Sequence, residues 1–163
     1  MPLPVLERSQ LERSRPEAPP SDGVFVTLTV ADQLCGVPVL GVRDVLGPQI
    51  ITRIPLAPPE IAGSLNLRGR IVTAIDLRCR LALPPPAAGV ARMSVVAEQG
   101  GDLYALLVDQ VGEVLTLPAS AFERNPPTLP ASWAACSIGI YRLPERLLVV
   151  LDVGRLLTLS QAA

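Results

Sequence analysis

The chain contains an internal repeat, and this repeat limits the folds that it can adopt. Residues 63–83 (GSLNLRGRIVTAIDLRCRLAL) align without a gap with residues 139–159 (GIYRLPERLLVVLDVGRLLTL), and residues 42–46 (VRDVL) are echoed by residues 111–115 (VGEVL). The repeat predicts two copies of one structural unit. Residues that the fold requires should recur, so positions at which the copies differ are the first candidates for function. The recurring residues of the longer pair are Gly63/Gly139, Leu67/Leu143, Arg70/Arg146, Asp76/Asp152, Leu81/Leu157 and Leu83/Leu159.

Apolar and β-branched runs, separated by turn residues, predict that each copy is built mainly from strands. Residues 71–75 are apolar enough for a strand that is covered on both faces. Gly69 provides the positive φ that a tight hairpin requires, and residues 60–62 are expected to form one helical turn. The expected strands are residues 24–30, 34–40, 42–46, 50–54, 71–75, 90–97, 103–108, 111–117 and 146–151.

A carboxylate stands at the same place in both copies, directly after a strand run. Asp76 and Asp152 each occupy the position of a helix N-cap, where the side chain accepts hydrogen bonds from backbone N–H groups of the first turn. Leu77 and Leu81, four residues apart, should then share one face of a short helix, and a C-terminal helix should follow Asp152. The recurrence therefore favours a structural role for both aspartates.

Polar and proline-rich stretches divide the chain. Residues 1–22 mix proline, glutamate, arginine and serine without periodicity, which predicts a disordered lead. Residues 84–89 (PPPAAG) are a stiff, polyproline-like linker between the copies. We expect one domain over residues 23–163, made of two lobes at about 23–83 and 90–163, and an exchange of strands between the lobes is left open.

The residue types on which most enzymes depend are missing. The chain has no histidine, and all 14 of its basic residues are arginine, which excludes histidine bases, Schiff-base lysines and Ser-His or Cys-His dyads. No phosphate-binding loop or dinucleotide motif is present, so no cofactor is expected. Cys35, Cys79 and Cys136 form no CxxC pair and are interpreted as small buried hydrophobes, so no metal site is expected. Only carboxylates are left as catalytic groups, and no two of them are placed so that their environments would give them clearly different pKa values. We therefore expect that the protein is not an enzyme.

Charge and hydropathy exclude two further classes of partner. The formal net charge is −1 and the arginines alternate with acids, which is unlike the basic surface of a nucleic-acid-binding protein. No apolar run approaches the roughly 18 residues of a membrane-spanning helix, and the N-terminus lacks the apolar core of a signal peptide. We expect a cytoplasmic protein with no nucleic-acid partner and no direct membrane insertion.

The clearest difference between the copies is a two-residue turn. Arg68-Gly69 in the first copy is replaced by Pro144-Glu145 in the second, which reverses the charge. Two interpretations stay open: Arg68 pairs with a carboxylate of its own molecule, or its planar guanidinium anchors a protein partner.

Around this turn the sequence resembles the CheW-like chemotaxis coupling proteins. The resemblance rests on an Asn-Leu-Arg-Gly turn followed by an apolar strand and Asp-Leu-Arg, within residues 61–69 (IAGSLNLRG) and 71–78 (IVTAIDLR). It extends over residues 25–159 and includes Ile54-Pro55 and residues 107–114 (LVDQVGEV). Each piece alone is a weak signal, but their combination is specific.

The resemblance implies a fold, a function and partners. The fold would be mainly β, with two intertwined five-stranded barrels and a few short helices, one of them C-terminal. The protein would be a non-enzymatic adaptor that couples the cytoplasmic tips of chemoreceptors to the regulatory domain of a CheA-type histidine kinase, in a membrane-associated signalling array that controls motility or a related output. The partner-contact residues would be Val42, Asp44, Asn66, Arg68 and Gly69. Asp44 stands where the family often has glutamate, and its shorter side chain puts any contact in doubt.

Two alternatives remain at this stage. Valines that alternate along a strand are more often core than contact residues, so Val42 fits either role. A generic β-barrel module that binds protein, peptide or nucleic acid is the alternative to the adaptor, although the chain has few aromatic side chains on which bases could stack.

Overall fold

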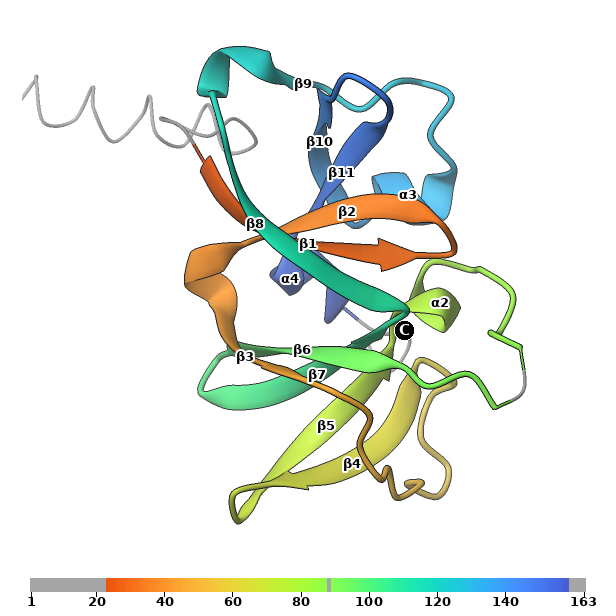
Figure 1. Cartoon of the computed structure of the whole chain (residues 1–163). Coiled ribbons are helices and arrows are strands. Elements are labelled where there is room, and N and C mark those ends of the chain that lie inside the picture. Colours follow the sequence, from red (N-terminus) through yellow and green to blue (C-terminus); the bar gives the residue numbers. More distant parts are fainter. Residues whose placement is uncertain (1–22, 88, 159–163) are drawn as a thin grey trace, which may run out of the picture.

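The computed structural model describes residues 23–87 and 89–158, which form two β-sheets (Figure 1). The predicted disordered lead, residues 1–22, lies outside the described residues, as does Leu159 at the end of the second repeat copy. Among the residues described, no helix is long and apolar enough to cross a lipid bilayer.

Each sheet forms one lobe, named here by its number of strands. The six-stranded lobe has the order β8-β1-β2-β11-β10-β9, and the five-stranded lobe has the order β3-β6-β7-β5-β4. The strands of the six-stranded lobe are β1 (Gly23–Val30), β2 (Gln33–Pro38), β8 (Gln110–Leu117), β9 (Phe122–Glu123), β10 (Ser137–Arg142) and β11 (Leu147–Leu151). Those of the five-stranded lobe are β3 (Val42–Leu46), β4 (Ile61–Leu67), β5 (Arg70–Asp76), β6 (Met93–Gln99) and β7 (Asp102–Val108).

The two lobes share one strand arrangement. In each lobe a parallel pair, β11 with β2 or β5 with β7, joins two antiparallel hairpins. A further antiparallel strand, β8 or β3, then pairs with the outer strand of one hairpin. The predicted mainly β fold with two intertwined, repeated lobes is confirmed, and the six-stranded lobe exceeds the expected five strands by β9, which has 2 residues.

The lobes do not follow the division of the sequence at the linker. The hairpin of β1 and β2 comes before the linker, yet it lies between β8 and β11. The hairpin of β6 and β7 comes after the linker and lies between β3 and β5. Each half of the chain therefore contributes a hairpin to the other lobe, so the boundaries 23–83 and 90–163 separate the sequence copies and not the sheets.

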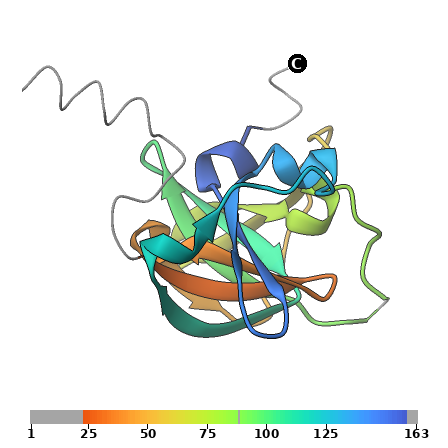
Figure 2. The same cartoon turned by 90° about the horizontal axis from the view of Figure 1, so that it is seen from above.

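Three of the short helices, those that follow β5, β9 and β11, lie on one side of the molecule (Figure 2). Both predicted caps are present: Asp76 Oδ1 accepts hydrogen bonds from the backbone N–H groups of Arg78 at 3.0 Å and Cys79 at 3.3 Å. Asp152 Oδ1 accepts one from Gly154 at 3.2 Å. The helices are η1 (Val39–Gly41), α2 (Leu77–Arg80), η2 (Ala119–Ala121), α3 (Ala131–Ala134) and α4 (Val153–Leu156).

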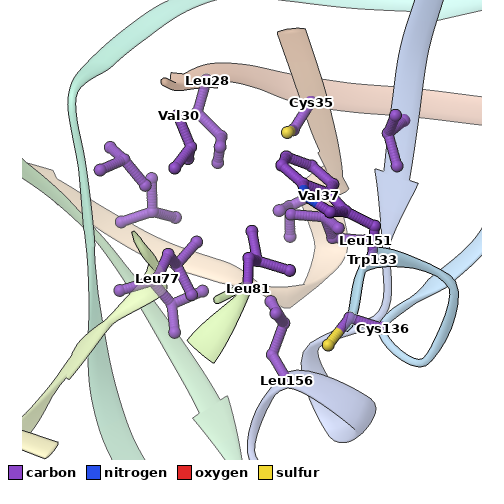
Figure 3. Packing of buried hydrophobic residues seen from close by; sticks show 14 of the residues in the cluster. Leu28, Val30, Cys35, Val37, Leu77, Leu81, Trp133, Cys136, Leu151 and Leu156 are labelled. Carbon is purple, nitrogen blue, oxygen red and sulfur yellow. The ribbon is translucent and has the colours of Figure 1, made fainter. Parts of the chain in front are cut away.

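The largest apolar cluster lies between the two lobes. Side chains from both sheets and from the helices converge in it, among them Leu28 of β1, Leu77 of α2 and Leu156 of α4 (Figure 3). A smaller cluster fills each lobe. Cys35 and Cys136 are buried in the central cluster, as predicted, and burial raises the pKa of both thiols. Cys79, predicted to be buried as well, is only half-buried.

The segment before β4 differs from its prediction. Residues 50–54 form no strand, because only Thr52 makes a β-bridge, to Ser64. The flanking prolines Pro48 and Pro55 lack the backbone donors that a longer ladder would need. The expected apolar run is therefore an exposed loop.

Three further expectations from the sequence are wrong in detail. Residues 60–62 form no helical turn, because Ile61 begins β4 and pairs with Ile75, and this pairing overrides the local preference. The strand expected to reach Leu40 ends at Pro38 and continues as η1. Ile71, expected to be covered on both faces, has 71% of its surface exposed.

An ion pair joins the lobes where β5 and β7 end. Arg78 of α2 donates to both carboxylate oxygens of Asp109, from Nε at 3.0 Å and from Nη2 at 2.7 Å. Asp109 Oδ2 also accepts a hydrogen bond from the backbone N–H of Ala31, in the β1–β2 turn, at 2.8 Å. The Arg78 guanidinium, more than the Ala31 N–H or the charge of Arg92, holds the pKa of Asp109 below its ordinary 3.8.

We expect the stabilisation from this ion pair to disappear in acid. A carboxylate whose pKa is lower in the folded state stabilises the fold fully above its unfolded-state pKa, and the effect is lost as the pH falls toward the folded-state pKa. The gap in unfolding free energy between wild type and Asp109→Asn should be full above about pH 5 and shrink below about pH 4. The charges of Arg78 and Arg92 lower the pKa of this carboxyl group, and the hydrogen bond to Asp109 and the charges of Asp76 and Asp32 raise the pKa of Arg78. Urea denaturation of both proteins across this range measures the gap, and a gap independent of pH would contradict the prediction.

Candidate partner-binding surface

The turn between β4 and β5 projects Arg68 from the tip of the five-stranded lobe. Arg68 and Gly69 both have positive φ, 52° and 86°, as the two central residues of a type I′ hairpin do. The Asn66 side chain accepts a hydrogen bond from the Gly69 N–H at 2.9 Å. Asn66 and Gly69 therefore shape the turn, and their contact with a partner stays a prediction.

The structure brings Arg68 together with a second residue singled out in the sequence. Arg68 Nη2 lies 3.3 Å from Asp44 Oδ2, with 79% of the arginine side chain and 26% of the aspartate side chain exposed. Asp44 thus reaches Arg68 despite being shorter than glutamate. Its other oxygen, Oδ1, accepts a hydrogen bond from the Val45 N–H at 2.8 Å, which fixes the carboxylate. Arg68 does pair within its own molecule, but most of its guanidinium side chain stays accessible to a partner.

Val42 has a different environment from Asp44. It is half-buried, pairs with Ala97 of β6 and packs against the central cluster. The core interpretation of Val42 is therefore favoured, and any partner contact would involve only its exposed part.

The surroundings of Arg68 form a shallow pocket, named here the charged tip. The pocket holds ≈ 200 Å³ and has an apolar floor of leucine and valine below a rim of three arginines and two acids. Arg43 is bound to Glu98 at 2.9 Å, whereas Arg70 makes no ion pair within the described part of the chain. The rim therefore carries excess positive charge and suits a partner group with a carboxylate. The charged tip is lined by Arg43, Asp44, Leu67, Arg68, Arg70, Val96, Glu98 and Leu103.

A larger hollow lies on the same lobe, and sequence reasoning missed it. This hollow, named here the apolar groove for its two exposed isoleucines, holds ≈ 550 Å³ and is lined by polar and apolar residues in equal number. The exposed isoleucines are Ile50 at 90% and Ile71 at 71%. Its shape depends on the course of the loop before β4 over the β4–β5 hairpin, which no local sequence signal reports. The apolar groove is lined by Pro48, Gln49, Ile50, Thr52, Ser64, Leu65, Asn66 and Ile71.

The six-stranded lobe has neither surface in the same form. At the position of Asn66 in the other copy stands Arg142, which is bound to Glu123 of β9 at 2.9 Å, and the position of Ile71 is taken by the half-buried Leu147. The turn that replaces Arg68-Gly69 carries the exposed Glu145. The surfaces of the two copies therefore differ in structure at the same positions at which their aligned sequences differ.

The junction of the lobes carries one further apolar side chain. Leu40 is 90% exposed and belongs to η1, which connects β2 of one lobe to β3 of the other (Figure 1). Four residues later along the same segment comes Asp44 of the charged tip. This short segment thus offers an apolar contact at Leu40 and, four residues later, an ionic contact at Asp44.

Comparison with known proteins settles the family. A model of the CheW-like domain matches residues 24–161. The chain belongs to the CheW-like family. Chemotaxis protein CheW of Klebsiella aerogenes is 30% identical over 139 residues, which are 85% of this chain and 84% of that protein. A probable chemotaxis protein CheW of Rhizobium etli is 27% identical over 144 residues, 87% of this chain and 93% of that protein.

A solved structure has the same fold. The crystal structure of the scaffolding protein TtCheW from Thermoanaerobacter tengcongensis superposes with a TM-score of 0.76 and 27% identity, and the match covers 85% of this chain and 94% of that one. The chain is thus a CheW-like chemotaxis protein with an adaptor role.

Proposed function

We propose that this CheW-like protein couples chemoreceptors to a CheA-type histidine kinase and catalyses no reaction itself. The observation that carries the proposal is the exposed Arg68, paired with Asp44 on one lobe and replaced by an acidic turn on the other. A residue that only stabilised the repeated fold would be expected in both lobes. The family membership supports an adaptor, and the asymmetry between the lobes supports surfaces that recognise different partners.

The charged tip and the lobe junction are the proposed site for the receptor. An amphipathic helix presents apolar and charged side chains on adjacent faces, so it can contact an apolar and a charged side chain of this surface at once. Leu40 offers the apolar contact and Arg68 the charged one. We infer that the receptor helix carries a carboxylate toward Arg68, because the rim of the tip has an excess of arginine.

The apolar groove is the proposed site for the kinase. A β-barrel domain that covers it would bury Ile50 and Ile71, and two large apolar side chains in the centre of an interface are typical anchors. The apolar groove and the charged tip share no lining residue, and we expect both partners to bind at once. On this proposal the protein is cytoplasmic and is recruited to receptor arrays at the membrane, where small receptor shifts bias the kinase between its on and off states.

Size-exclusion co-migration tests the proposal. The full chain is mixed with regulatory domains of CheA-type kinases and with receptor-tip fragments from the same cell, at about 30 µM, a concentration at which micromolar complexes stay associated. We expect a complex with one kinase and one receptor fragment. Failure to bind any of them would overturn the adaptor and favour a generic β-barrel binding module.

Ile71→Asp separates the two sites. A charge in the apolar groove should weaken the kinase complex by at least about tenfold, because a buried unpaired carboxylate is costly. Receptor binding should be unchanged. Val114→Asp is the matched control, because Val114 is an exposed valine of the six-stranded lobe. Equal losses in both variants, or loss of receptor binding in Ile71→Asp, would refute the assignment of the groove to the kinase.

A further inference from the structure

Helix α2 holds the opposite lobe through two arginines. It follows β5 of the five-stranded lobe, and its Arg78 binds Asp109, which in turn binds the β1–β2 turn of the six-stranded lobe. Arg78 Nη1 also donates to the carbonyl of Pro84 at 2.8 Å, at the start of the linker. The side chains of Arg78 and Asp109 are only 16% and 21% exposed, so water competes weakly for these bonds.

The second arginine of α2 reaches a different element. Arg80 donates from Nε to the carbonyl of Leu156 at 3.0 Å and from Nη2 to that of Arg155 at 2.9 Å. These carbonyls end α4, which follows β11 of the six-stranded lobe, where helical carbonyls lack intrahelical partners. Two points of the six-stranded lobe are thus bound from one short helix.

The turn that Asp109 holds is itself conformationally demanding. Ala31 and Asp32 have φ of 50° and 67°, a region that residues other than glycine adopt at a cost in free energy. Asp109 binds the turn by its side chain, to the Ala31 N–H, and binds the end of β1 by its backbone N–H, to the Thr29 carbonyl at 3.0 Å. The carboxylate therefore fixes the turn and the arginine of the other lobe with one group.

These bonds differ in kind from the apolar packing between the lobes. Burial of apolar surface is a non-directional driving force. A bidentate arginine–carboxylate pair has fixed geometry and resists rotation. We propose that Arg78 and Asp109 form a clasp that holds the two lobes at one relative orientation.

The clasp has a consequence for signalling, which rests on the proposed function. A receptor helix at Leu40 lies on the connection between the lobes and would sense their orientation, whereas the apolar groove lies within one lobe. Release of the clasp should therefore weaken receptor binding by at least about tenfold and leave kinase binding unchanged.

Distances between spin labels test the clasp without any partner. Spin labels are attached to cysteines introduced by Asp102→Cys in the five-stranded lobe and Thr116→Cys in the six-stranded lobe, in a Cys79→Ser background. The distance between the labels, measured by pulsed electron paramagnetic resonance, reports the relative orientation of the lobes. The wild-type clasp should give one narrow distance, and Asp109→Asn should shift or broaden it. Glu123→Gln is the matched control, because it removes an ion pair within one lobe, and it should leave the distance unchanged.

Each outcome decides the proposal. An unchanged narrow distance in a folded Asp109→Asn variant overturns the clasp, as does an equal change in Glu123→Gln. If Asp109→Asn fails to fold, Arg78→Lys decides, because lysine keeps the charge but loses the two-point fork. Wild-type protein that binds no receptor fragment refutes the proposed function and leaves the distance measurement unaffected.

Discussion

Arg68→Glu should fold like the wild type and fail to transmit the receptor signal to the kinase. The ion pair that it removes has 79% of the Arg68 side chain exposed, and exposed pairs contribute less than about 1 kcal/mol. The turn is held by Asn66 and Gly69, which the substitution leaves in place. Reversal of the charge next to Asp44 makes the tip repel the carboxylate that we propose it recognises. We expect the unfolding free energy to change by less than about 1 kcal/mol, and receptor affinity to fall at least about tenfold.

Two measurements and one control separate recognition from stability. Urea denaturation gives the free energy of unfolding, and kinase activity with and without receptor gives the coupling. Arg142→Glu is the control, since Arg142 is also exposed, at 62% of its side chain, and also ion-paired, to Glu123. It should retain coupling. An unfolded Arg68→Glu protein would make Arg68 structural, and an equal coupling defect in Arg142→Glu would reduce the effect to general charge.

Local signals predicted the elements that local interactions determine. Asp76 and Asp152 were recognisable as caps because a capping carboxylate bonds to N–H groups two or three residues away. Gly69 was recognisable because a two-residue hairpin requires positive φ. The repeat itself predicted two similar lobes, since residues that one unit needs for folding are needed by its copy.

Features that depend on distant pairing were missed. Ile61 reads as part of a helical turn, but its partner Ile75 places it in β4. Local sequence signals do not decide the exchange of hairpins between the lobes, because each hairpin is compatible with either sheet until both sheets exist. The apolar groove required the path of the loop before β4, which a single bridge at Thr52 fixes.

The candidate site was predicted in part. Arg68 came from the difference between the copies and from the resemblance, and Asp44 came from the resemblance alone. The two residues do lie together. Val42 packs mainly against the core. A pattern of alternating valines does not show whether such a residue packs in the core or contacts a partner protein. Leu40 was expected inside a strand and is instead exposed at the lobe junction, because the strand ends at Pro38.

Gly63→Ala should have the largest effect on stability of the changes considered. Gly63 sits at a bulge where β4 slips against β5, with φ of 149°. An added Cβ would collide with the backbone carbonyl of Thr52 and lie 2.8 Å from Ile51 Cγ2. Thr52 cannot withdraw, because its N–H and carbonyl both bond Ser64 at 2.8 Å. Backbone strain and overpacking together should lower the free energy of unfolding by about 3 kcal/mol or more.

Gly139, the counterpart of Gly63 in the second copy, should be similarly sensitive to an added side chain. Gly139 also sits at a bulge, and an added Cβ there would collide with the Phe122 ring and lie 2.7 Å from the carbonyl oxygen of Glu123. Gly139→Ala should therefore be similarly destabilising in urea denaturation. Gly47→Ala should change the unfolding free energy by less than about 0.5 kcal/mol, because no atom lies within 4 Å of its added Cβ. If all three variants lose the same stability, close approach of a neighbouring segment does not explain why glycine recurs at this position of the repeat. If only the Gly63 and Gly139 variants are destabilised, glycine recurs because another segment of the lobe crosses close to the strand at this position in both copies.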